Sequence, residues 1–216
     1  MVRLAGGTAL FLGALIAALP AQVPATDIRN TETPESNTHF TLREYGSLQE
    51  WQVKRLRLRR QILTAAGLLP MPRKTPLRPQ IFGRTEYGDY SIEKVLIETL
   101  PGFYLAGNLY RPMGRKGRFP GVLGPHGHWK HGRLENTAQV SVPGRRISLA
   151  RQGYVVFAYD MVGFGDTKQL DHDFGGKAEQ LWSFTPLGLQ LWNSIRAVDF
   201  MQSLRDVDDS RIAVTG

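Results

Sequence analysis

The sequence contains no cysteine among its 216 residues. This absence excludes disulfide bonds, zinc sites with thiolate ligands and cysteine nucleophiles. It does not identify the cellular compartment, because a chain without cysteine is compatible with oxidising and reducing surroundings alike.

Acidic side chains are the minority among the charged residues. There are 19 Asp and Glu against 27 Lys and Arg, which gives a formal net charge of +8 and raises nucleic acid as a partner. The basic residues are dispersed, however, and cluster only at residues 54–60 and 111–118. We therefore expect no nucleic-acid partner.

Long apolar runs are missing except at the N-terminus. Arg3 precedes an apolar segment over residues 9–19, and small residues follow, with cleavage expected after Ala21 or Ala25. This pattern predicts a signal peptide over residues 1–25 and a secreted or periplasmic protein. Glycines interrupt the segment, which disfavours a spanning helix. Membrane association is expected only if the segment stays uncleaved.

Residues 26–46 are polar and without period, which predicts a linker or N-terminal arm. Ser47 stands three residues before Glu50, the capping box that opens a helix. The apolar side of this helix is expected at Leu48, Trp51, Leu56, Leu63 and Ala66. Gly67 should end it, and the run K-R-L-R-L-R-R should be its solvated face.

A β-hairpin is predicted next. Residues 72–79 form an extended connector, residues 92–99 alternate as a strand, and a Pro-Gly turn leads to a returning strand at 104–110. We expect this hairpin at the edge of the sheet. A buried strand follows at residues 121–124 and opens into the loop P-H-G-H-W-K-H.

The rest of the chain alternates helices and strands. A helix ends over residues 147–152, residues 154–159 form a continuously apolar strand, and a buried strand begins at residue 212. Between these strands, Pro186 opens a helix whose apolar residues are Leu187, Leu191, Ile195, Val198, Met201 and Leu204. The alternation predicts an α/β fold, with a doubly wound, mostly parallel sheet and an N-terminal antiparallel hairpin.

The His-rich loop has three interpretations. Gly127 lets the backbone approach a substrate, so that the N–H of His128 could stabilise an oxyanion. The spacing H-x-H-x-x-H is also similar to the H-x-H-x-D-H of metallo-β-lactamase-type hydrolases, but Lys130 occupies the acidic position and those folds stack two sheets. The third interpretation is a polar surface loop. Trp129 belongs either to a substrate pocket or to the packing of the loop.

Two further segments carry polar residues. D-M-V-G-F-G-D follows the strand at 154–159, and we expect Asp160, Gly163 and Gly165 to shape the turn. The sequence D-H-D at residues 171–173 is interpreted as a solvated loop, with a lid or a cation site as the alternative.

Three segments carry a resemblance to known proteins: P-G-V-L-G-P-H-G-H-W, Y-V-V-F-A-Y-D-M-V-G-F-G-D and S-I-R-A-V-D-F-M-Q-S-L-R-D-V-D-D-S-R-I-A-V-T-G. Together they resemble the α/β-hydrolases, and more narrowly the secreted bacterial acetylxylan and related carbohydrate esterases. The resemblance covers residues 47–216. It implies a Ser-His-acid ester hydrolase for acylated carbohydrate or another small ester, with no cofactor and no metal.

The same resemblance implies that Gly216 is the first glycine of the nucleophile elbow G-x-S-x-G. The serine, the acid and the histidine would then follow Gly216, and Asp160, which precedes it, would not be the catalytic acid. Residues 47–216 would be the N-terminal part of the domain, inactive alone and with an exposed apolar edge at the strand from residue 212. The alternative function is a non-catalytic exported binding or scaffold protein. Peptidases and dienelactone-type hydrolases share the fold.

Overall fold

The computed structural model of the protein describes residues 35–39, 44–173, 175–181 and 185–216. The predicted signal peptide and most of the predicted linker lie outside these residues. The chain divides into two units, residues 1–46 and 47–216, and the helices and strands below belong to the second. Within the described residues no helix is both long and apolar enough to cross a membrane.

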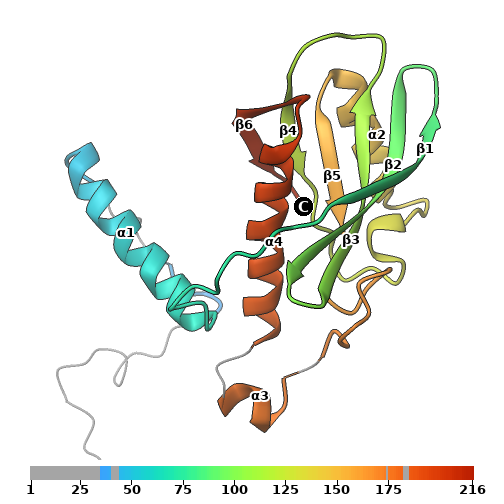
Figure 1. Ribbon diagram of the computed structural model, residues 1–216. Helices are drawn as coiled ribbons and strands as arrows, with labels where there is room; N and C mark the ends of the chain where they lie inside the picture. Colours follow the sequence, from blue (N-terminus) through green and yellow to red (C-terminus); the bar gives the residue numbers. More distant parts are fainter. Residues whose placement is uncertain (1–34, 40–43, 174, 182–184) are drawn as a thin grey trace, which may run out of the picture. The chain divides into compact units, whose positions relative to one another are not determined.

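The predicted succession of helix, hairpin, strand, helix, strand, helix and strand is confirmed (Figure 1), and the structure adds three elements, β1, η2 and α3. In chain order the elements are α1 (Leu48–Ala65), β1 (Gln80–Glu86), β2 (Tyr90–Leu100), β3 (Phe103–Pro112), β4 (Phe119–Leu123), the 3₁₀ helix η2 (Gly132–Leu134), α2 (Val142–Gln152), β5 (Val155–Tyr159), α3 (Lys177–Leu181), α4 (Pro186–Ser203) and β6 (Val207–Val214).

The six strands form one sheet in the order β1-β2-β3-β5-β4-β6. Strands β4, β5 and β6 are parallel, whereas β2 is antiparallel to both of its neighbours, β1 and β3, and β3 is antiparallel to β5. The α/β class is therefore confirmed. The sheet is mixed rather than mostly parallel, because half of its strands belong to the antiparallel N-terminal part.

Strand β1 corrects the expectation that the hairpin forms the edge of the sheet. It pairs outside β2, and all seven of its residues are exposed. Its pairing is also irregular between Phe82 and Thr85, where Gly83 has a φ of +63°. A strand with no buried face has no alternation of apolar and polar residues, so the period that identifies strands is missing.

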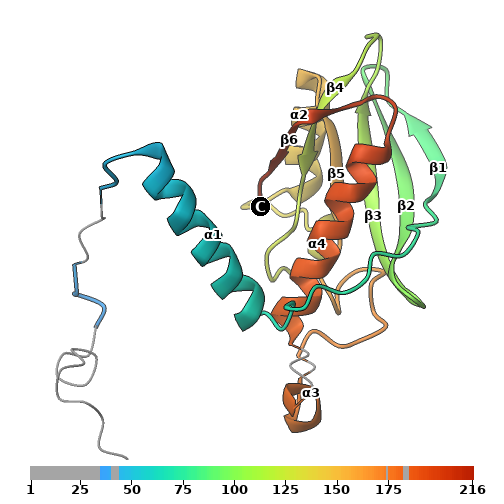
Figure 2. The same ribbon diagram turned by 60° about the vertical axis from the view of Figure 1, so that its left-hand side comes forward.

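Helices cover both faces of the sheet (Figure 2). On β5, Val156 and Ala158 pack with Ala150 of α2, whereas Phe157 and Tyr159 belong to the cluster that contains Phe200 of α4. Successive residues of a strand point to opposite faces. The continuously apolar sequence of β5 is thus explained, because both of its faces are buried.

Helix α4 lies where it is predicted, but its buried face is rotated. Leu187 is 65% exposed, and Leu191, Ile195 and Val198 are only partly buried. Of the predicted residues Met201 is fully buried, and the other fully buried apolar side chains of the helix are Leu189, Trp192, Ala197 and Phe200. Phe200 packs against Phe157 of β5, whereas Trp192 packs with Leu63 at the end of α1.

Helix α1 begins at the predicted cap, where the Ser47 hydroxyl accepts a hydrogen bond from the Glu50 N–H at 3.1 Å. Its expected apolar side is buried only at the C-terminal end. Leu63 and Ala66 are buried with Trp192 of α4, whereas Leu48 and Leu56 are 71% and 61% exposed.

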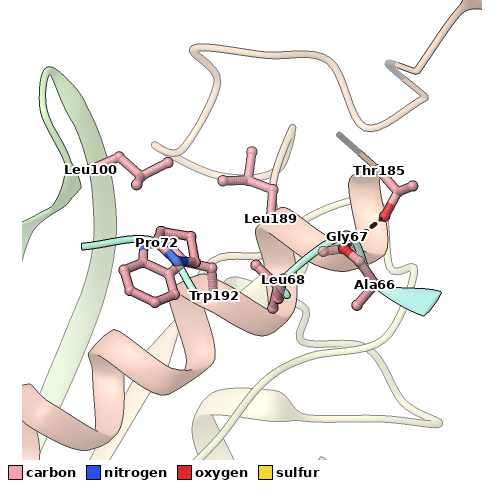
Figure 3. Close-up of a pocket in the computed structure, with 9 residues that line it drawn as sticks. Ala66, Gly67, Leu68, Pro72, Leu100, Thr185, Leu189 and Trp192 are labelled. Atoms are coloured by element: carbon pink, nitrogen blue, oxygen red, sulfur yellow. Dashed lines mark hydrogen bonds between the residues drawn. The ribbon is translucent and has the colours of Figure 1, made fainter. Parts of the chain in front are cut away.

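The end of α1 meets the start of α4 around a small cavity of about 50 Å³ (Figure 3). Ala66, Leu68, Leu189 and Trp192 line it, and the Thr185 hydroxyl donates a hydrogen bond to the Ala66 carbonyl at 3.5 Å. A Cβ atom at Gly188 would overlap that same carbonyl oxygen. The two backbones therefore approach each other more closely than any residue other than glycine at position 188 would allow.

We predict that Gly188→Ala destabilises the protein by about 1–3 kcal/mol, because a backbone oxygen cannot rotate away from the added methyl group. Urea denaturation measures the change in the free energy of unfolding. Leu187→Ala, an exposed neighbour in the same turn, is the control and should change it by less than about 0.5 kcal/mol. Equal effects of the two substitutions would contradict the close contact.

Candidate functional site

The loop after β4 is fixed by a buried histidine. The ring of His126 donates from Nδ1 to the Gly127 carbonyl at 2.6 Å and accepts at Nε2 from the Met161 N–H at 3.0 Å. Met161 follows β5, so this one imidazole joins the loops after two neighbouring parallel strands. In α/β sheets the carboxyl ends of such strands carry the binding sites.

The three residues that follow His126 are exposed. The Trp129 N–H donates to the Gly127 carbonyl at 2.8 Å, whereas the backbone N–H of His128 makes no hydrogen bond with any described residue. An added Cβ at Gly127 would lie 3.0 Å from Nε1 of the Trp129 indole. The loop thus presents a backbone donor, and its predicted role as an oxyanion-hole donor stays a prediction.

A buried arginine lies at the end of the same loop. Arg133 donates from Nε to Asn108 Oδ1 at 2.6 Å, from Nη1 to Asp160 Oδ2 and from Nη2 to Asp166 Oδ2 at 2.5 Å. The Asp166 N–H donates to the same Asp160 oxygen at 2.8 Å. We call Asn108, Arg133, Asp160 and Asp166 the charged cluster. It connects β3 with the loops after β4 and β5.

Burial and neighbouring charges shift the pKa values of Arg133 and Asp160 in opposite directions. Burial alone would lower the pKa of Arg133, but the carboxylates of Asp160 and Asp166 raise it, so the guanidinium stays charged. Burial raises the pKa of Asp160 against the opposing effect of Arg133. Burial is also the main cause of the lowered pKa of His126, whose Nε2 lies 4.0 Å from Asp160 Oδ1.

The turn after β5 contains Asp160 and the two glycines predicted to shape it. Gly163 and Gly165 have φ angles of +83° and +54°, and the Gly163 N–H donates to the Thr167 carbonyl at 2.8 Å. A Cβ at Gly165 would overlap the Asp160 carboxylate. The turn can therefore fold back over the buried acid only with glycine at this position.

His172 corrects the interpretation of D-H-D as a wholly solvated loop. Asp171 and Asp173 are exposed, but His172 is half-buried and its ring lies 4.7 Å from those of both His128 and Phe164. Its Nδ1 also lies 2.9 Å from the Val162 carbonyl. These contacts pack the loop after β5 against the exposed side of the His-rich loop.

A metal is not favoured by the geometry of the three loop histidines. Both ring nitrogens of His126 are engaged by backbone groups. Among the described residues no group of three or more histidine, aspartate or glutamate side chains could hold a metal ion.

Gly216, the predicted start of the nucleophile elbow, lies beside the loop. The Thr215 N–H donates to the Leu123 carbonyl of β4 at 2.9 Å, and Arg145 of α2 donates to the Gly216 carbonyl at 3.2 Å. A Cβ at Gly216 would lie 3.2 Å from the Pro125 carbonyl oxygen. The structure thus brings the end of β6 next to the start of the His-rich loop.

Sequence reasoning missed Arg133, Asn108 and Asp166. Arg133 ends the His-rich segment, but its partners lie 25 residues before it and 27 and 33 residues after it. No local pattern in the sequence connects this arginine with the aspartates of the D-M-V-G-F-G-D turn, because the contacts depend on the order of the strands.

The His126 environment predicts an acid-sensitive stability. The lowered pKa keeps the folded imidazole neutral, whereas the unfolded chain binds a proton below the ordinary value of 6.5. The free energy of unfolding should therefore fall as the pH drops from about 6.5 towards the lowered pKa.

In the variant His126→Gln the part of this pH dependence that comes from His126 should be absent, because the glutamine amide can accept the hydrogen bond of the Met161 N–H and does not titrate. Urea denaturation at about pH 7 and about pH 5 measures the difference. His39→Gln, which changes an exposed histidine elsewhere, should keep the pH dependence of the parent chain. Parallel pH profiles for the parent and His126→Gln would contradict the assignment.

Comparison with known proteins identifies the fold. No family model matches the chain. YtaP of Bacillus subtilis (strain 168), a protein provisionally named a hydrolase, is 28% identical over 176 residues, which are 73% of this chain and 54% of YtaP. The chain thus spans about half the length of the curated relative that it matches.

Two solved structures have the same fold. Methylesterase BT1017 is 25% identical with a TM-score of 0.62, and the match covers 80% of this chain and 37% of that one. Acetyl xylan esterase from Paenibacillus sp. R4 is 24% identical with a TM-score of 0.51, and the match covers 74% of this chain and 50% of that one. This chain therefore has an α/β-hydrolase fold and resembles esterases of that fold.

Proposed function

We propose that this sequence is the N-terminal part of an exported serine-type hydrolase of carboxylic esters on acylated carbohydrate. The observation that carries the proposal is the position of Gly216 beside Pro125, which directly precedes the His-Gly-His segment. In an ester hydrolase of this fold, the nucleophile and an oxyanion donor must meet at that place. The similarity to a methylesterase and the fold shared with an acetyl xylan esterase support a carboxylic ester as the bond that is cleaved.

The chemistry follows from what each part supplies. A serine two residues past Gly216 would attack the ester carbonyl, after a histidine later in the polypeptide takes its proton. The negative oxygen that develops needs backbone N–H donors held in place before the reaction. His128 offers such a donor, since its N–H is unengaged among the described residues and its ring is packed against Phe164 and His172.

Residues of this chain would act by positioning. His126 holds the His-rich loop against the backbone after β5, and Arg145 holds the Gly216 carbonyl. These contacts set the separation between the two backbone segments that would face the ester. The predicted signal peptide supports export of the protein to a place where it would meet an acylated polysaccharide.

The DNA beyond the codon for Gly216 gives the first test. Our proposal requires that the next four codons encode any residue, serine, any residue and glycine. It also requires that the complete protein hydrolyses p-nitrophenyl acetate and that phenylmethylsulfonyl fluoride abolishes this activity. A stop codon at that place would favour the non-catalytic binding or scaffold protein instead.

The 216-residue chain alone should be inactive and should self-associate. Val214 in the edge strand β6 is 62% exposed, and Ala213 is exposed beside it. Unpaired apolar edge strands recruit other chains. Size-exclusion chromatography and p-nitrophenyl acetate hydrolysis, compared with the complete protein, measure both properties. A monomeric chain with ester turnover that depends on one of its own serines would overturn the proposal.

Gly127→Val should lower kcat of the complete protein by about a hundredfold or more, because a branched side chain, crowded against the Trp129 indole 3.0 Å from its Cβ, would keep the loop backbone away from the substrate. Steady-state kinetics on p-nitrophenyl acetate measures the loss. Lys130→Ala, an exposed side chain in the same loop, serves as the control and should stay within about twofold of the parent. If Gly127→Val did so too, the loop would not be the oxyanion donor.

A further inference from the structure

A groove of about 410 Å³ lies on the sheet next to the charged cluster. Strands β1, β2 and β3 form its floor, and residues from the loops after β4 and β5 form one wall. Its size is within the range of small-molecule binding sites. The residues used below are Phe82, Lys94, Asn108, Arg133, Leu134 and Asp166.

The floor is a row of side chains across three strands. Phe82 pairs with Lys94, and Lys94 pairs with Asn108, so all three point to the same face of the sheet. Neighbouring strands are about 4.8 Å apart, so the row spans about 10 Å. It ends at Arg133, which donates to Asn108 Oδ1 at 2.6 Å.

The row leads towards the candidate site. Arg133 is bonded to Asp160, and the residue after Asp160 donates its N–H to His126 of the His-rich loop. A ligand lying along the row would therefore extend from the edge strand β1 towards the loops at the carboxyl ends of β4 and β5. Such a groove suits an extended ligand better than a compact one.

The chemistry of the groove is mixed. Phe82 and Leu134 are 52% and 53% exposed. Lys94 is exposed and makes no hydrogen bond or ion pair with any described residue, and the Asp166 side chain is 72% exposed. An apolar ligand would leave the ammonium group of Lys94 without a partner. A polyanion would meet the carboxylate of Asp166.

A sugar ring matches this combination, since it offers an apolar face of C–H groups and a rim of hydroxyl donors and acceptors. The exposed ring of Phe82 can cover the face, and Lys94, Asn108 and Asp166 can bond the rim. We propose that the groove binds the glycan chain that carries the scissile ester. This inference rests on the proposed function and extends it from the acyl group to a subsite for the chain.

The test uses the complete protein and two substrates, p-nitrophenyl acetate and acetylated xylo-oligosaccharide. Phe82→Ala should lower kcat/KM on the oligosaccharide about fivefold or more and leave p-nitrophenyl acetate within about twofold. Lys94→Ala should have the same pattern of effects, a lower kcat/KM on the oligosaccharide and little change on p-nitrophenyl acetate. Ile81→Ala is the matched control, because Ile81 is the neighbour of Phe82 on the opposite face of β1. It should leave both values unchanged.

Binding of xylohexaose, which has no ester, separates the two proposals. Isothermal titration calorimetry should show binding by the parent and weaker binding by Phe82→Ala, whether or not the protein hydrolyses esters. Binding without ester hydrolysis would refute the proposed function and support the groove. Ester hydrolysis that Phe82→Ala changes equally on both substrates or on neither, with unchanged xylohexaose binding, would overturn the groove.

Discussion

The buried guanidinium of Arg133 connects parts of the chain that are far apart in sequence. It meets Asn108 of β3, Asp160 after β5 and Asp166 at the end of the glycine turn, so three segments share one charged group. Taking this charge out of water is costly, and the cost is offset only while all of its donors are bonded. The loops on either side of the candidate site are therefore constrained together, and a change in one alters the other.

Strong periodic patterns in the sequence predicted the central elements. Strand β5 is apolar at every position because α2 and α4 cover its two faces, and α1 begins at the Ser47 cap because that contact is local. Strand β1 could not be found in this way, since its side chains are all exposed. The buried face of α4 was predicted only in part: Met201 is buried as expected, but Trp192 and Phe200, which are buried too, were not among the residues that the spacing selected.

The candidate site was predictable only where backbone conformation determines it. The His-Gly pair and the glycines of the turn indicated their loops, because glycine is required wherever the backbone turns sharply or approaches closely. Arg133 could not be assigned, as its partners are brought to it only by the order of the strands. The packing of His172 on His128 is likewise a contact between loops that no local pattern encodes.

The order of the strands also determines when the loop after β4 can acquire its shape during synthesis. Strand β4 lies between β5 and β6, and both of these strands come later in the chain. Gly121 pairs with Val155 on one side and with Ile212 on the other. Contacts between residues so distant in sequence form slowly, because long loops must close first. The His-rich segment therefore leaves the ribosome before its supports, because its contacts with Met161 after β5 and with Gly216 after β6 can form only once those residues have been made.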